Sequence, residues 1–397
     1  MSVRSEALAR PLPLKPERPV EAALPRASLL FGTTRGDNAQ MLNLAQALGW
    51  PFEVKGEVDG VPMTVVDRVA HAFGYRLRRN KPLLSSLLWP DLILCCGGRR
   101  VIDALRIKDL SEGRSKIVCI GRPWADLDLF DLVITTPQYR LPTRQNVLMN
   151  AMPLNQPSAE ALAIAANEWH GDIKHLPTPW IAVLVGGNSG SCIFDANAAQ
   201  RLAAEANAVA AQTGGSLLIS TSGRTPKPAV DTLLSQINGP HFAFRWEKTA
   251  QRNPHLGFLA LANRFIVTSD SASMIAEAIS TGREVSIFEV PLRRRSRWLT
   301  KKRKFGHTTH QMHRWLTEKG LWIPARDMNA YRDNLIDGSY VLDGEQANDS
   351  FSPRRPRDLD RAIEAIYGLF PSLSPPRGSD DIVKVRRSHA HGFAIAG

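Results

Sequence analysis

Short apolar runs alternate with helical patterns along most of this chain. In the first half, apolar runs that end in small or polar residues lie at 28–32, 91–96, 117–121 and 132–136. The second half repeats the scheme at 180–185, 216–220, 265–268 and 284–288. Strand-like runs that alternate with helices are typical of βαβ units and of parallel sheets. The pattern therefore predicts an α/β fold built in two halves.

The same pattern predicts the domain organisation. We expect a first domain at residues 28–175 and a second at 178–345, with the Pro-rich residues 176–179 as a hinge between them. A helical region at 346–370 follows, and its helix can cross back to the first domain. The ends of the chain, 1–27 and 371–397, are rich in proline and lack a clear apolar period, so we expect disordered tails.

The most informative stretch is residues 265–278. An apolar run ends there in small polar residues, and an amphipathic helix follows. Ser269, Ser271 and Ser273 would lie at the positive end of this helix, where backbone N–H groups without a partner favour a phosphate or diphosphate. Glu277, about two turns into the helix, could accept hydrogen bonds from ribose hydroxyls. The alternative is an ordinary strand–turn–helix in which Asp270 or Ser271 caps the helix.

Two other strand ends in the second half carry similar chemistry. Small and polar residues that suit a phosphate follow these strands at Gly186, Gly187, Asn188, Thr221, Ser222 and Arg224. Glycine lets the backbone approach a phosphate, hydroxyls donate to it, and an arginine can bind it with two hydrogen bonds. Because the carboxyl ends of parallel strands share one edge of a sheet, we predict a site for a nucleotide sugar or another phosphorylated small molecule. The glycine motifs of ATPases and of dinucleotide-binding enzymes are absent from the sequence, which excludes both classes.

Composition indicates the charge of the expected partners. The 397 residues are 43% hydrophobic and carry a formal net charge of +12, which favours anionic partners such as phosphorylated metabolites, acidic lipid or nucleic acid. The apolar runs are too short for a membrane-spanning helix, and we expect a cytoplasmic protein. The four cysteines form no Cys-x-x-Cys pair, so we expect reduced thiols, no structural zinc and no bound cofactor.

A basic run lies at residues 293–304. It contains eight Lys or Arg residues, of which we single out Arg293, Arg294, Arg295, Arg297, Lys301 and Lys302 for contact with an anionic membrane surface or a phosphorylated acceptor. This contact would place the protein at the inner face of the membrane. A solvated charged face is the alternative. Residues 75–89 mix basic and apolar side chains and form a second candidate surface, or a helix packed inward. We expect no nucleic-acid partner, because no recognised binding module accompanies the charge.

Three histidines, His307, His310 and His313, are spaced three residues apart. Two of them could share one helical face, but a metal would need a further ligand such as Glu318. We expect solvated or phosphate-facing histidines and no metal site.

Several separate motifs resemble the mitochondrial-fission ELM family, and together they extend over most of residues 28–325. The motifs are Gly36-Asp37-x-x-Gln40, Gly97-Gly98-Arg99-Arg100, Thr221-Ser222-x-Arg224-Thr225-Pro226, Asn253-Pro254-x-x-Gly257 and Ser269-Asp270-Ser271-x-Ser273-Met274-x-x-Glu277. The last motif is the most specific and adds Met274 to the candidate site. The segment around 120–123 departs from the family pattern, as does the basic stretch that follows Pro291.

The resemblance implies a GT-B-like fold, in which two Rossmann-like domains face each other across a cleft. It also implies that a nucleotide sugar binds mainly to the second domain, while the first takes the acceptor. We therefore expect a glycosyltransferase-type protein that acts on a cell-envelope acceptor. The family is named for a plant protein at the mitochondrial surface, so the alternative is a non-catalytic scaffold or a membrane-surface recruiting protein.

Asp37 is the candidate catalytic base. It follows the first predicted strand and would face the cleft, where an inverting glycosyltransferase needs one base near the acceptor hydroxyl. The diphosphate that leaves would be stabilised by backbone N–H groups and arginine. The alternative is that Asp37 caps the helix that contains Gln40.

Overall fold

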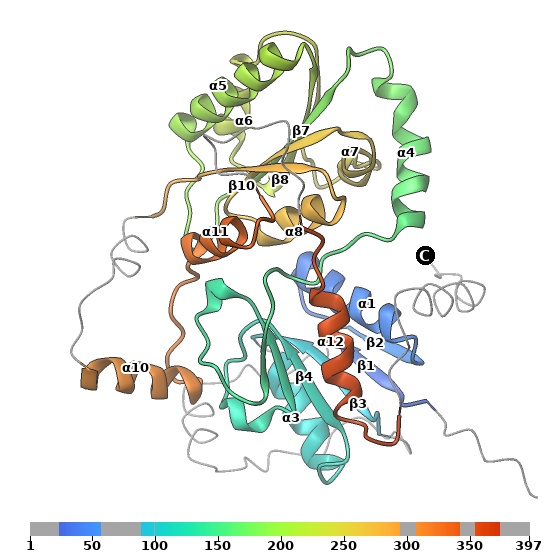
Figure 1. The fold of residues 1–397 in the computed structure, drawn as a ribbon, viewed down its shortest axis with the longest axis vertical. Coiled ribbons are helices and arrows are strands. Elements are labelled where there is room, and N and C mark those ends of the chain that lie inside the picture. Colours follow the sequence, from blue (N-terminus) through green and yellow to red (C-terminus); the bar gives the residue numbers. More distant parts are fainter. Residues whose placement is uncertain (1–23, 57–88, 99, 294–306, 342–353, 374–397) are drawn as a thin grey trace, which may run out of the picture.

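The computed structural model describes residues 24–56, 89–98, 100–293, 307–341 and 354–373. These residues form two α/β domains, which lie one above the other in Figure 1. The predicted α/β fold of two Rossmann-like domains is thereby confirmed. The domain boundary near residues 176–179 stays a prediction, and most of both predicted tails lies outside the described residues.

The first domain contains a six-stranded parallel sheet with the order β2-β1-β3-β4-β5-β6. Its strands are β1 (Ala27–Leu30), β2 (Phe52–Lys55), β3 (Leu92–Cys96), β4 (Lys116–Ile120), β5 (Leu132–Thr135) and β6 (Val147–Met149). Successive side chains of a strand point to opposite faces. Leu29 and Leu94 accordingly pack with helix α1 (Arg35–Leu48), while Leu30 and Ile93 pack on the other face with α3 (Arg100–Leu110).

The second domain contains a five-stranded parallel sheet with the order β11-β10-β7-β8-β9. The strands are β7 (Trp180–Gly187), β8 (Ser216–Arg224), β9 (His241–Phe244), β10 (Arg264–Thr268) and β11 (Glu284–Phe288). Its helices are α4 (Ala159–Ile173), α5 (Ala196–Thr213), α6 (Lys227–Ser235), α7 (His255–Leu261), α8 (Ala272–Ser280) and α11 (Met328–Asp337). Strand β7 is buried along its whole length, as expected for the centre of a sheet covered on both faces.

After β11 the chain returns to the first domain, and it changes domain twice more. Helix α10 (His307–Glu318) lies beside the lower domain of Figure 1, and α11 lies in the upper domain. Helix α12 (Asp358–Tyr367) returns to the lower domain and packs beside α1 through Ile363 and Ile366. The hydroxyl of its last residue, Tyr367, accepts a hydrogen bond of 3.0 Å from Trp50 Nε1. The final helix therefore covers one face of the sheet with which the chain begins.

All eight strands expected from the apolar runs are present. Helix α1 ends at Leu48, and the glycine that follows, Gly49, has a φ of 69°, which suits glycine at a helix C-terminus. The three strands that the sequence did not indicate, β2, β6 and β9, are edge strands with few buried residues. Strands β7 and β8 run further than expected, because a register shift at Gly187 lets the pairing continue to Arg224. Thr221, Ser222 and Arg224 thus belong to strand β8, and the prediction that they follow the strand was wrong.

The packing of α12 gives a prediction for stability. Ile366 is fully buried, so Ile366→Ala should lower the free energy of unfolding by about 2–5 kcal/mol through lost burial and the cavity left behind. Urea unfolding followed by circular dichroism measures this change. Ile164→Ala on α4 is the matched control, because Ile164 is 69% exposed and its loss should cost under about 0.5 kcal/mol. Equal effects of the two substitutions would contradict the packing described for α12.

Candidate functional site

A cleft lies where the two sheets present the points at which their strand order reverses. In a doubly wound sheet, ligands bind at the carboxyl ends of the strands, where the strand order reverses. These points fall between β1 and β3 in the first sheet and between β7 and β10 in the second. The segments that follow β1, β7 and β10 contribute to one cleft of about 1070 Å³. Both domains therefore offer their ligand-binding edges to the same space.

The amino-terminal ends of α1 and α8 approach each other in this cleft. A Cβ atom on Gly36 would lie 2.8 Å from Ser273 Oγ, so only a residue without a side chain fits there unchanged. Ser271 occupies the N-cap position of α8, yet its side chain makes no capping hydrogen bond within the described residues. Of the two residues weighed as N-cap, Ser271 holds the position and Asp270 does not. The first N–H groups of α8 thus face a cleft in which an anion would be stabilised.

Glu277 lies farther along α8 and is held by a histidine. Its Oε2 is 2.7 Å from Nε2 of His255, the first residue of α7. The backbone N–H of His255 donates in turn to Asn253 Oδ1 at 3.0 Å. Both partners of the pair line the cleft and are partly exposed. This contact orients the Glu277 carboxylate and leaves its second oxygen available to a ligand.

Arg224 forms an ion pair with a buried carboxylate. Its Nη1 is 2.8 Å from Oδ2 of Asp270, whose side chain is inaccessible to solvent, and 3.2 Å from the carbonyl oxygen of Asn188. Burial raises the pKa of Asp270, and the charge of Arg224 opposes that rise. A Cβ atom on Gly186 would lie 2.4 Å from Asp270 Oδ2, so the glycine makes room for this carboxylate. Phosphate binding by Arg224 stays a prediction.

Several predicted residues hold the strand ends together. The Asn188 side chain accepts from the backbone of Phe194 at 2.9 Å, and Ser269 Oγ accepts from Val290 at 3.0 Å. Thr221 Oγ1 accepts from the Trp246 N–H at 2.9 Å, and the Ser222 hydroxyl donates to the Gly186 carbonyl. These side chains shape the cleft by fixing its walls.

The structure divides the predicted phosphate and nucleotide residues into two groups. Those that line the cleft are Thr221, Ser222, Arg224, Ser271, Ser273, Met274 and Glu277. Those that support it from behind are Gly186, Gly187, Asn188 and Ser269. Their roles toward a ligand stay predictions.

Asp37 lines the cleft from the first domain. Helix α1 begins at Arg35 and has Thr34 at its N-cap, so the alternative that Asp37 caps this helix was wrong. Burial raises the pKa of Asp37, while the positive charge of Arg326 and a hydrogen bond from Thr34 lower it. Burial has the larger effect, so the carboxylate is a stronger base than an exposed aspartate.

Sequence reasoning missed much of the first-domain wall. Arg122, Tyr139 and Arg326 line the cleft near Asp37, and they come from segments far apart in the chain. Two buried amides, Gln138 and Asn150, each carry a side-chain oxygen without a hydrogen-bond partner among the described residues. The departure from the family pattern at residues 120–123 marked Arg122, but no local signal marked the others.

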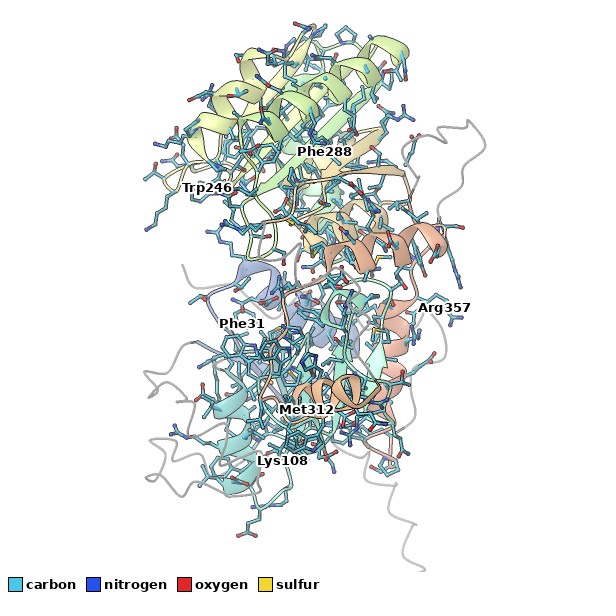
Figure 2. All side chains as sticks on the ribbon, turned by 90° about the vertical axis from the view of Figure 1, so that its left-hand side faces the viewer. Phe31, Lys108, Trp246, Phe288, Met312 and Arg357 are labelled. Carbon is cyan, nitrogen blue, oxygen red and sulfur yellow. The ribbon has the colours of Figure 1, made fainter. Side chains whose placement is uncertain are left out.

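An aromatic side chain lies at the rim of the second-domain wall. Trp246 is 37% exposed and lines the cleft beside Gly223, with Lys248 two residues further on. Figure 2 shows Trp246 on the upper domain at the side that faces the viewer. An exposed indole at such a rim can stack on a planar base.

Other predictions fall partly outside the described residues. Only Arg293 of the singled-out basic residues is described; it is exposed, and its Nε donates to the Ser189 carbonyl at 3.1 Å. Of the second candidate surface, only Trp89 is described, and it packs partly buried against the first-domain core. His313 stacks on Trp322, with 5.9 Å between ring centroids.

No group of three or more His, Cys, Asp or Glu side chains among the described residues is arranged to hold a metal ion. All four cysteines are buried and unbridged. Within the same residues, no helix is both long and apolar enough to cross a bilayer.

Two solved structures are distantly similar to this chain. The UDP-GlcNAc 2-epimerase of Neisseria meningitidis has 13% sequence identity and a TM-score of 0.44, covering 88% of this chain and 100% of that one. A glycosyltransferase of Rickettsia africae has 10% identity and a TM-score of 0.42, with the same coverage. At these scores the likeness says nothing about substrate.

The sequence comparisons are more specific. The mitochondrial fission protein ELM1 of Arabidopsis thaliana is 29% identical over 220 residues, which are 50% of this chain and 51% of the plant protein. The chain thus matches about half the length of that relative. An uncharacterised protein of Rickettsia prowazekii is 26% identical over 251 residues, covering 55% of this chain and 70% of that protein. The model of the mitochondrial fission ELM1 family matches residues 35–326, which include both faces of the cleft, and the chain belongs to this family.

Proposed function

We propose that this protein binds a nucleotide sugar in the cleft and transfers the sugar to an acceptor hydroxyl. The observation that carries the proposal is the open amino-terminal end of α8, which faces Asp37 across the cleft and has Glu277 further along the same helix. The N–H groups of α8 would hold the diphosphate, because they have no partner within the helix. Glu277, oriented by His255, would accept hydrogen bonds from the ribose.

The chemistry needs few groups. Asp37 accepts the proton of the acceptor hydroxyl as the hydroxyl oxygen bonds to the anomeric carbon. The bond from that carbon to the diphosphate breaks, and its electron pair leaves on the diphosphate. The α8 end and Arg224 stabilise the charge that develops there.

Calorimetry with a panel of nucleoside diphosphates and nucleotide sugars tests donor binding. Glu277→Gln should weaken binding of the best ligand about tenfold or more. The reason is that the substitution removes the charge-assisted hydrogen bonds that the carboxylate accepts from the ribose hydroxyls. His255→Ala should weaken it less, since it only releases Glu277. Glu364→Gln on the exposed face of α12 is the matched control and should change nothing. A folded protein that binds none of these compounds would refute the proposed function.

The pH dependence tests Asp37. A base must be ionised, so the transfer rate should rise with pH through the pKa of Asp37, which burial raises above 3.8, and fall at lower pH. Asp37→Asn should remove this limb and lower the rate by about 10²–10⁴-fold, whereas Asp333→Asn at an exposed position of α11 should not. Donor hydrolysis provides the rate when no acceptor is known. An unchanged rate in Asp37→Asn would exclude Asp37 as the base.

An exposed apolar cluster favours a second candidate function, recruitment to an anionic membrane surface. Met312 and Trp315 lie on α10 and are 55% and 44% exposed, and Trp322, close behind the helix, is also 44% exposed. Figure 2 shows Met312 on α10 at the surface of the lower domain. This cluster follows the basic run of residues 293–304 in the chain. Basic residues near aromatic ones are typical of proteins that bind acidic bilayers.

Vesicle flotation tests this candidate. The protein should bind anionic vesicles at low salt and release them as salt screens the charges, since each Lys or Arg near the surface contributes about 1 kcal/mol. Replacement of Arg293, Arg294 and Arg295 by Gln, or of Met312 and Trp315 by Ser, should weaken binding. Trp246→Ser, which removes an exposed indole from the other domain, is the control. Equal binding to neutral and anionic vesicles would reject the candidate.

A further inference from the structure

Two arginines crowd the first-domain wall of the cleft. Arg122 and Arg326 both lie over the ring of Tyr139, with Cζ at 5.6 Å and 5.4 Å from its centroid. They come from segments on either side of the second-domain sheet in the sequence, after β4 and before α11. Two like charges beside one ring repel each other, and an anion placed near both would relieve this repulsion.

The protein supplies little negative charge to these arginines. Arg122 donates to the backbone carbonyls of Pro324, at 2.6 Å, and Tyr139, at 3.4 Å, which are neutral acceptors. Its residue is only 8% exposed, and its Nε has no hydrogen-bond partner among the described residues. Burial and the neighbouring Arg326 lower the pKa of Arg122 to about 10. Arg122 is thus a buried cation with unused donor capacity.

Arg326 is more open to the cleft. Its residue is exposed, and within the described part of the chain its guanidinium forms neither an ion pair nor a hydrogen bond. The carboxylate whose charge it feels is that of Asp37. Arg35, at the start of α1, adds a third cation to the same side of the cleft. Three arginines therefore face one carboxylate.

We propose that Arg122 and Arg326 form a second anion site, which binds a phosphate ester on the acceptor. Guanidinium groups bind phosphate oxygens through paired hydrogen bonds, and a dianionic ester would balance the excess charge of this wall. The inference rests on the proposed function, because it assigns the class of acceptor. The order of groups across the cleft agrees with this inference. Gly36 lies against Ser273 at the donor end, and the next residue, Asp37, feels the charge of Arg326. The base would lie between the two anions.

Calorimetry with sn-glycerol 3-phosphate as the probe tests this site, once in protein saturated with the best nucleoside diphosphate and once in protein without it. The phosphate ester should bind in both states, and glycerol should not. Arg326→Gln should weaken the ester about tenfold or more and leave the nucleotide affinity unchanged. Arg106→Gln, which removes an exposed arginine of α3, is the matched control for net charge. Arg326→Lys should keep part of the affinity, because it retains the charge without the fork.

The direction of the affinity change in a second variant separates this site from a general attraction of anions. Asp37→Asn should strengthen binding of the ester, since it removes the carboxylate next to Arg326, while it abolishes transfer. Weaker ester binding in Asp37→Asn would overturn the proposal. So would loss of nucleotide affinity in Arg326→Gln without any ester binding, because the arginines would then serve the donor.

The outcomes distinguish this inference from the proposed function. A protein that binds no nucleotide can still bind the ester in a way that depends on Arg326. That result would refute the proposed nucleotide-sugar site and support the second anion site. Vesicles of phosphatidic acid and of phosphatidylcholine identify the source of the phosphate ester. Arg326-dependent binding to the first alone would assign a lipid phosphate, and binding of the free ester without vesicle binding would assign a soluble one. Failure of both would overturn the proposal.

Discussion

The contact between Gly36 and Ser273 determines how the cleft is built. It brings the positive ends of α1 and α8, one from each domain, to the same place. Two helix ends that face each other repel, and their N–H groups need partners. A glycine at position 36 allows the approach, and the α8 N-cap hydroxyl stays available. The arrangement is thus electrostatically incomplete without an anion or water, which is the physical basis of the proposed donor site.

The two walls of the cleft differ in how far their polar side chains already have partners within the protein. In the second domain, predicted polar residues already have partners in the protein: Arg224 pairs with Asp270, Glu277 with His255, and Ser222 with the Gly186 carbonyl. Such a wall is pre-organised, since its side chains lose little freedom when a ligand binds. In the first domain, the amide oxygens of Gln138 and Asn150 and the guanidinium of Arg326 lack such partners among the described residues. An anionic ligand there would supply a partner to the exposed guanidinium of Arg326.

Much of the fold and of the second-domain wall could be predicted from the sequence. What could not be predicted has clear physical causes. Apolar runs indicated the seven strands inside the two sheets, because burial on both faces leaves a continuous apolar signature, and they also indicated the edge strand β11. They did not indicate the other edge strands, β2, β6 and β9, which contain no fully buried residue. The α8 end was readable because strand, serines and helix are contiguous. Arg122 and Arg326 lie far apart in the chain and meet only through the fold, so no local pattern could have paired them.

The return of α12 to the first domain has a consequence for how the chain is made. During synthesis, the first sheet emerges with α1 long before residues 358–367 leave the ribosome. Until then the part of the first sheet and of α1 that Ile363 and Ile366 contact lacks this helix. The second domain, whose strands and flanking helices follow one another closely, can close most of its core earlier, although it awaits Tyr331 of α11. The domain that begins the chain would therefore be the last to finish folding, in contrast to proteins whose domains fold in the order of their synthesis.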